Sequence, residues 1–230
     1  TGINYSGALG TQTAAVKVAG ITEPGANTVN VEEYNGSSWT EVNNVNTTRQ
    51  GGAGVGTLTA GLFVTGIGPG VVTNVEEYDG TNWTEIADVN TAKWLVGGSP
   101  AGTTTAAVKF GGNPTAAETE QWDGSSWTEV ADLNTTRSGV LGAGTSTAAL
   151  AAGGEGPAQK LAISEEWNGS AWAEGNDLNE GVQNAFSGAG IQTAAFKAGG
   201  NLDGPLSAVT EHYDGTSWFT SANINTARWG

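Results

Sequence analysis

The chain has 230 residues, no cysteine, and a formal net charge of −15 from 23 acidic and 8 basic side chains. Phosphate binding requires several positioned cations, so this composition argues against nucleic acid and anionic membranes as partners. The absence of cysteine excludes disulfides, the single histidine argues against a zinc site, and no apolar stretch is long enough to predict membrane insertion.

A short phrase recurs five times: an aromatic residue, Asn-Gly or Asp-Gly, two small residues and a tryptophan. The first copy covers residues 34–39, and the later copies begin at Tyr78, Trp122, Trp167 and Tyr213. The closing tryptophans are 44, 44, 45 and 46 residues apart. A fixed period of this length indicates a repeat architecture. We expect one domain over residues 1–230 with repeats at approximately 1–46, 47–90, 91–134, 135–179 and 180–230.

Each repeat predicts four short strands, as residues 139–174 illustrate. Small residues at 139–144 are followed by an apolar run at 147–152, which ends at Gly153-Gly154. A third segment covers 161–167, and the fourth begins at Trp172. None of these segments has the 3.6-residue period of a helix. Asn-Gly and Asp-Gly permit the positive φ of tight turns, so the third and fourth strands are expected to form a hairpin.

After the fourth strand, each repeat has an Asx-aliphatic-Asn triplet. The five copies are Asn44-Val45-Asn46, Asp88-Val89-Asn90, Asp132-Leu133-Asn134, Asp177-Leu178-Asn179 and Asn223-Ile224-Asn225. Asn and Asp side chains hydrogen-bond to nearby backbone. We interpret the triplet as the crossover to the inner strand of the next repeat, with the aliphatic residue pointing inward.

Four antiparallel strands repeated radially describe a β-propeller. We therefore expect an all-β, five-bladed β-propeller with four-stranded antiparallel blades. Small inner runs such as residues 51–54, 142–144 and 187–190 suit the crowding near a narrow axis. The termini are expected to meet between blades five and one, where residues near 6–10 would follow the crossover at 225–228.

The chain resembles the kelch-repeat propellers over all 230 residues. The resemblance is carried by Gly pairs at 111–112, 153–154 and 199–200, by the third-strand aromatic and by the fourth-strand tryptophan. The first two repeats differ, with Ala19-Gly20 and Thr65-Gly66. The Asp-Gly-x-x-Trp-Thr-Glu and Asn-Thr-Ala-Arg phrases also resemble predicted structural proteins of marine bacteriophages. That resemblance implies a virion surface or extracellular location, with other virion or surface proteins and cell-surface glycans as partners.

A glutamate stands two residues before each third-strand aromatic, at Glu32, Glu76, Glu120, Glu165 and Glu211. A cation follows the crossover at Arg49, Lys93, Arg137 and Arg228, with Val182 in the remaining copy. Residues two apart share a face of a strand, and a buried carboxylate requires a partner. We therefore expect a ring of structural Glu–Arg/Lys pairs that ties blade to blade. The repeated aromatic residues and tryptophans are expected in the core.

Candidate binding residues lie where the repetition breaks. Trp94 and Trp229 occupy a position that holds Gln50, Ser138 and Gln183 in the other repeats. An extra tryptophan there can stack on a sugar ring or a partner surface, or it can fill a local gap. Both interpretations stay open at this point.

No catalytic, metal or cofactor residue is predicted, because the recurrent acids suit packing and the lone His212 replaces a Glu or Gln of other repeats. The expected function is a non-enzymatic structural and binding propeller, such as a virion decoration or appendage protein that attaches to host glycans. One alternative is a lectin-like carbohydrate-binding module with several equivalent pockets. Another is a glycoside hydrolase with carboxylates on the axis.

Overall fold

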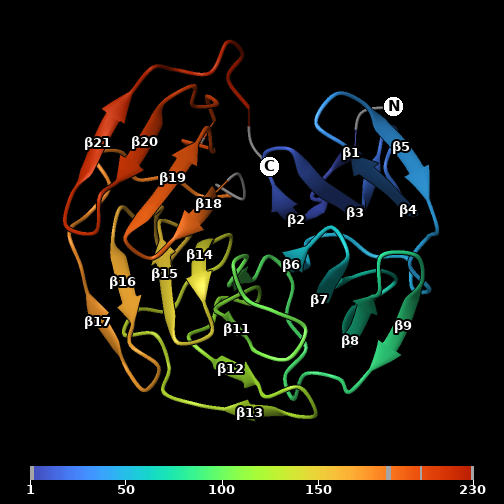
Figure 1. Cartoon of the computed structure of the whole chain (residues 1–230). Coiled ribbons are helices and arrows are strands. Elements are labelled where there is room, and N and C mark those ends of the chain that lie inside the picture. The colour runs from blue at the N-terminus through green and yellow to red at the C-terminus, as the bar shows by residue number, and fades with distance from the viewer. Residues whose placement is uncertain (1–2, 185–187, 203, 229–230) are drawn as a thin grey trace.

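The computed structural model describes residues 3–184, 188–202 and 204–228 (Figure 1). Within these ranges the chain forms β-strands and no helix, so no described helix could span a membrane. The strands form five separate sheets arranged around one axis (Figure 1). The expected all-β fold, a five-bladed β-propeller with four-stranded antiparallel blades, is confirmed.

The blades follow chain order from the inner to the outer strand. Blade one contains β2 (Gly7–Thr11), β3 (Ala14–Thr22), β4 (Ala26–Tyr34) and β5 (Trp39–Val42), and blade two contains β6 (Ala53–Thr57), β7 (Ala60–Ile67), β8 (Val71–Tyr78) and β9 (Trp83–Ile86). Blade three contains β10 (Gly97–Gly98), β11 (Ala107–Phe110), β12 (Thr119–Trp122) and β13 (Trp127–Glu129). Blade four contains β14 (Leu141–Thr145), β15 (Ala148–Ala152), β16 (Ser164–Trp167) and β17 (Trp172–Glu174). Blade five contains β18 (Gly188–Ile191), β19 (Ala194–Ala198), β20 (Thr210–Tyr213) and β21 (Trp218–Ser221). Blade one has an additional short strand, β1 (Ile3–Asn4), which pairs with the far end of β3.

The Asx-Gly phrase forms the turn of the outer hairpin in every blade. In blade three, Trp122 and Trp127 are cross-strand partners, and Oδ1 of Asp123 accepts hydrogen bonds from the backbone N–H groups of Ser125 and Ser126 at 2.8 Å. Gly124 adopts a φ of +95°, which glycine permits at no steric cost. The recurrent turn therefore forms the expected hairpin, and it places the two aromatic residues opposite each other.

Glycine allows the inner strands of neighbouring blades to approach closely. A Cβ atom on Gly54 would lie 2.1 Å from the carbonyl oxygen of Ala8, and one on Gly142 would lie 2.1 Å from that of Gly98. Both contacts join adjacent blades, and neither glycine has a positive φ. The small inner runs therefore meet a packing requirement between blades.

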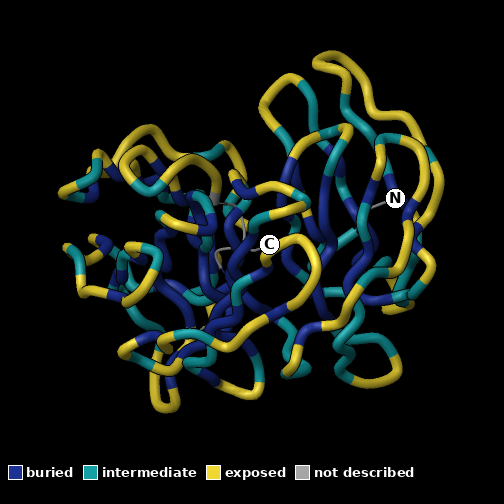
Figure 2. Tube along the Cα trace, turned by 60° about the horizontal axis from the view of Figure 1, so that its bottom comes forward, coloured by how far each residue is buried: buried dark blue, intermediate teal, exposed yellow. Residues whose placement is uncertain are grey.

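The core lies between blades rather than at a single centre. Each cluster of buried side chains combines the second strand of one blade with the aromatic pair of the next. In the first cluster, Val16 of β3 and Val31 of β4 pack with Tyr78 and Trp83. The buried segments run through the blade interiors, and the exposed ones lie mainly in the peripheral loops (Figure 2). Trp83, Trp127, Trp172 and Trp218 are 5–6% exposed, which confirms their expected place in the core. Trp39 is 50% exposed, so the same expectation is wrong for blade one, because no blade covers it.

Candidate functional site

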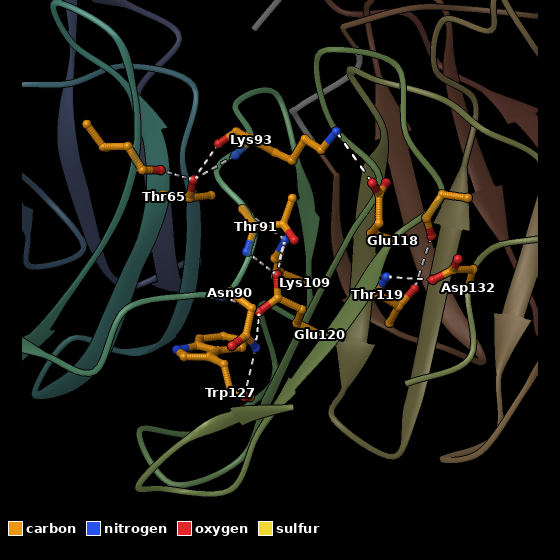
Figure 3. A network of polar contacts seen from close by, with 12 residues as sticks. Thr65, Asn90, Thr91, Lys93, Lys109, Glu118, Thr119, Glu120, Trp127 and Asp132 are labelled. Atoms are coloured by element: carbon orange, nitrogen blue, oxygen red, sulfur yellow. Dashed lines mark hydrogen bonds and ion pairs between the residues drawn. The ribbon is translucent and has the colours of Figure 1, made fainter. Parts of the chain in front are cut away.

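The repeated glutamates form the most highly organised polar sites in the described chain. In blade three, Glu120 projects from β12 into the space in front of the crossover from blade two (Figure 3). Its Oε2 accepts hydrogen bonds from the backbone N–H of Asn90 at 2.6 Å and from the Asn90 side-chain amide at 2.9 Å. Its Oε1 accepts from the N–H of Thr91 at 3.0 Å and lies 2.8 Å from Nζ of Lys109. The buried carboxylate is thus fully partnered, as burial of a charge requires.

The same arrangement recurs at four blade boundaries. The residue pairs Asn46/Thr47, Asn90/Thr91, Asn134/Thr135 and Asn179/Glu180 donate to Glu76, Glu120, Glu165 and Glu211 respectively. We call the asparagine backbone N–H, its side-chain amide and the following N–H the crossover donors. The asparagine amide also donates to the carbonyl of the outer-strand tryptophan, for example Asn90 to Trp127 at 2.8 Å. Each crossover is thereby fixed to the blade that follows it.

The cation beside each carboxylate comes from one of two places. In blades two and four it is the arginine after the crossover, with Arg49 2.5 Å from Glu76 and Arg137 2.8 Å from Glu165. These two pairs are among those expected from the sequence. Arg49 also donates to the backbone carbonyls of Thr65 and Phe63, so its guanidinium is held against blade two.

In the other blades the cation is a lysine on the second strand. Lys109 faces Glu120 directly across β11 and β12, and Lys197 has the same relation to Glu211 across β19 and β20. The Nζ of Lys197 is 3.8 Å from Glu211 and 3.3 Å from Glu180. Blades two and four have Phe63 and Ala151 at this position, opposite Glu76 and Glu165. The cation beside each repeated glutamate is therefore either the arginine after the crossover or the lysine on the second strand.

Two of the expected cations lie elsewhere. Lys93 was expected in the ring of Glu–cation pairs, but its Nζ lies 3.6 Å from Glu118, and Lys109 instead occupies the space beside Glu120 (Figure 3). Arg228 is exposed and forms no ion pair within the described residues, while its Nε donates to the carbonyl of Thr226. Glu32, another expected member of the ring, lies 3.0 Å from Lys17. The second-strand lysines are thus the partners that sequence analysis did not assign.

Burial shapes the electrostatics of the arginine pairs. Desolvation lowers the pKa of Arg137, and the charge of Glu165 opposes that shift. The pKa of Arg49 is lowered for the same reason, with Glu76 again opposing. A guanidinium remains protonated in proteins, so both pairs are ionic at neutral pH. Their fixed hydrogen bonds and repetition suit a structural role in joining blades.

A different kind of site lies where the inner strands converge. A pocket of about 90 Å³ is formed by segments of blades one to four, and it is lined by residues 5–8, 51–54, 96–98, Pro100, Val140 and Gly142. Its lining consists mostly of backbone and small side chains, and it contains no Asp, Glu, His, Lys or Arg. Proton transfer by a side chain requires a titratable group near pH 7, and this lining offers none.

Trp94 lies beside this pocket. Its ring centroid is 6.4 Å from that of Tyr5, with an interplanar angle of 64°, and its Cε3 would lie 3.0 Å from a Cβ on Gly51. Trp94 is half-buried. Burial also raises the pKa of the Tyr5 phenol, so it stays protonated and can donate a hydrogen bond. Trp229, the other binding candidate, lies outside the described residues.

Comparison with known proteins identifies no family for this chain. No protein-family model matches the chain, and no curated protein sequence matches it either. Within the described ranges, no group of three or more His, Asp or Glu side chains could hold a metal ion.

Proposed function

We propose that this propeller is a non-enzymatic structural and binding module displayed on a virion or another extracellular surface, where it attaches to cell-surface glycans. The observation that carries the proposal is the Tyr5–Trp94 aromatic pair at the edge of a pocket without charged lining residues. An aromatic face can pack against the C–H bonds of a sugar ring, while a phenol supplies a polar contact. The phage-like repeat phrases of the sequence support the virion setting.

Several features favour attachment over catalysis. The four fully buried repeated glutamates are each held by crossover donors and a cation, so none is available to act as an acid or base. Glycoside hydrolysis generally uses a pair of carboxyl groups across the scissile bond, and the axial pocket lining contains none. Rigid ion pairs between blades instead make a stable support for a surface contact.

The test combines a glycan array with titration calorimetry on the strongest array hits. We expect saturable binding with about one site per chain, and at least a tenfold loss of affinity in Trp94→Ala, in line with the cost of removing a central aromatic anchor. Phe219→Ala is the matched control, because Phe219 is 54% exposed on the outer strand β21, away from the axis. Binding that survives Trp94→Ala would refute the proposal. Several equal sites per chain would instead favour the lectin-like alternative with pockets between blades.

A further inference from the structure

The axial pocket beside Trp94 is lined by main chain more than by side chains. Its lining includes residues 7–8, 52–54, 97–98 and Gly142, which lie on or next to the inner strands β2, β6, β10 and β14. In the described chain, each of these strands pairs only with the second strand of its own blade. The other edge of such a strand offers backbone N–H and C=O groups. The lining therefore combines hydrogen-bond donors and acceptors with an uncharged surface.

The glycines of this lining explain why backbone forms its walls. A Cβ atom on Gly97 would lie 2.2 Å from the ring of Phe110, on the second strand of the same blade. A Cβ atom on Gly98 would lie 2.9 Å from that of Ala53 in the preceding blade. A side chain at either position would therefore point at a neighbouring strand and not into the pocket. The surface that a ligand meets between these positions is the strand edge itself.

The loop between β10 and β11 of blade three covers one end of the pocket. The carbonyl oxygen of Pro100 accepts a hydrogen bond from the N–H of Gly56 in blade two at 3.1 Å. The N–H of Ala101 donates to the carbonyl oxygen of Gly144 in blade four at 3.0 Å. Gly56 and Gly144 stand near the ends of β6 and β14, whereas Trp94 precedes the beginning of β10. The loop and Trp94 therefore lie at opposite ends of the pocket, and a ligand enters beside Trp94.

The size of the pocket limits what can enter it. Its volume of about 90 Å³ is about three times the share of one water molecule in the liquid, which is about 30 Å³. Pockets that enclose a whole small ligand are larger, at about 300–1,000 Å³. A substituent of about four non-hydrogen atoms fits this space, and a sugar ring has to stay at the mouth. The rings of Tyr5 and Trp94, with centroids 6.4 Å apart, are available to it there.

Charge narrows the class of substituent further. The buried ion pairs are neutral as pairs, so the net charge of −15 belongs to the remaining groups, and it repels anionic sugars. The lining has no basic residue to bind a carboxylate or sulfate and no acidic residue to bind an ammonium group. Transfer of an unpaired charge into such a site is costly. The substituent that fits is neutral, has one hydrogen-bond donor and one acceptor, and ends in an apolar tip. An acetamido group meets all of these requirements.

We propose that the axial pocket takes up the acetamido group of an N-acetylated sugar in a neutral glycan, an assignment that rests on the glycan attachment proposed above. The amide N–H and C=O of the ligand bond to the unpaired edges of the inner strands, and its methyl group points toward Pro100. The sugar ring packs on Trp94 at the mouth. Because the loop that contains Pro100 covers the far end, the pocket accepts an acetyl group and excludes longer acyl chains.

The first test compares methyl glycosides that differ in one substituent, by titration calorimetry on the wild-type protein. In the gluco and galacto series, the ring carries an acetamido, hydroxyl, ammonium or butanamido group at the same carbon. We expect the acetamido compound of at least one series to bind about tenfold or more tightly than its three analogues. Equal affinities within both series would overturn the acetamido assignment and leave glycan attachment standing. Absence of binding by any sugar, on the array as well, would reject both proposals.

The second test enlarges the covered end of the pocket. Pro100→Ala removes part of a lining side chain and keeps the carbonyl that accepts from Gly56, so affinity for the butanamido compound should rise several-fold while affinity for the acetamido compound changes little. Pro69→Ala, in the exposed turn between β7 and β8, is the matched control and should change neither affinity. Saturation-transfer NMR on the wild type gives an independent measure, with the strongest transfer expected at the acetyl methyl group. Unchanged selectivity in Pro100→Ala, or weak transfer to that methyl group, would reject its placement in the pocket.

Discussion

Lys109 and Glu120 stand directly opposite each other on β11 and β12, with Nζ 2.8 Å from Oε1, and both side chains are buried. The same cross-strand position holds Ala151 opposite Glu165 in blade four, where Arg137 supplies the charge from the crossover. The carboxylate therefore needs one cation, and the propeller provides it from either of two positions. This relationship can be tested by moving the charge from one position to the other.

Arg137→Val should destabilise the protein by about 3–5 kcal/mol, because it leaves the buried Glu165 carboxylate without a cation. Adding Ala151→Lys to that variant should recover about half or more of the loss, since valine plus lysine is the combination of Val182 and Lys197 in blade five. Urea unfolding measures both effects. Ala151→Lys alone is the control, and it should destabilise by placing a second cation in a filled site. Failure of the double variant to exceed Arg137→Val in stability would contradict the two-position interpretation.

Glu120→Gln should cost about 3–5 kcal/mol of unfolding free energy, because Lys109 then lies buried without a counter-charge. Glu129→Gln is the matched control. Glu129 is the cross-strand partner of Glu120 but is exposed, so its replacement should change stability by less than about 0.5 kcal/mol. Equal effects of the two substitutions in thermal or urea unfolding would show that the buried ion pair has no special role.

Gly142→Ala should destabilise the protein by about 1–3 kcal/mol through overpacking. Its Cβ would lie 2.1 Å from the carbonyl oxygen of Gly98 in the neighbouring blade, and that atom belongs to backbone that cannot rotate away. Gly70→Ala provides the comparison, because a Cβ there meets no atom within 4 Å. Calorimetric melting of the two variants would show whether the inner strands require glycine for their spacing. A stable Gly142→Ala protein would mean that the blades can move apart at no cost.

Asp123 connects the turn chemistry to pH. Hydrogen bonds from the backbone N–H groups of Ser126 and Ser125 lower the pKa of Asp123 to about 2. A depressed folded-state pKa means that the carboxylate stabilises the fold above the unfolded-state value near 4, and that this contribution disappears as the pH falls from about 4 to about 2. NMR titration should detect the carboxyl midpoint near 2.

Asp123→Asn should remove that titration and keep the turn, since Asn35 and Asn168 accept the same hydrogen bonds in blades one and four. A midpoint near 4 in the wild-type titration would show that these hydrogen bonds are not formed in solution.

The sequence predicted the blades because their signals are local. The Asx-Gly turn, the tryptophan that follows it and the small inner run each act within a few residues, so five four-stranded sheets could be expected without coordinates. A ring of Glu–Arg/Lys pairs was also expected from the repeat, and the structure forms such pairs between Arg49 and Glu76 and between Arg137 and Glu165. These features depend on spacing that a single repeat already displays.

Other parts of the polar sites depend on register between strands and therefore could not be predicted from spacing alone. Asn90 was interpreted as a turn residue that bonds its own backbone, whereas it donates to Glu120 in the next blade. Lys109 was not assigned to Glu120, because facing positions on β11 and β12 depend on the length of the loop between them. A usable signal exists in blades two to five, where lysine occurs at this second-strand position only if no arginine follows the preceding crossover; blade one has Lys17 although Arg228 follows the crossover of blade five.

The origin of the cation also bears on how such a propeller can change its blade order. A sheet that carries both Lys109 and Glu120 has a balanced internal charge, so it can be duplicated, deleted or exchanged without regard to the unit before it. A sheet whose cation is Arg49 or Arg137 of the preceding crossover must be duplicated or exchanged together with that crossover. Recombination within a repeat family of this type should therefore favour breakpoints before the crossover for arginine-dependent units, and should tolerate breakpoints on either side of it for lysine-containing ones.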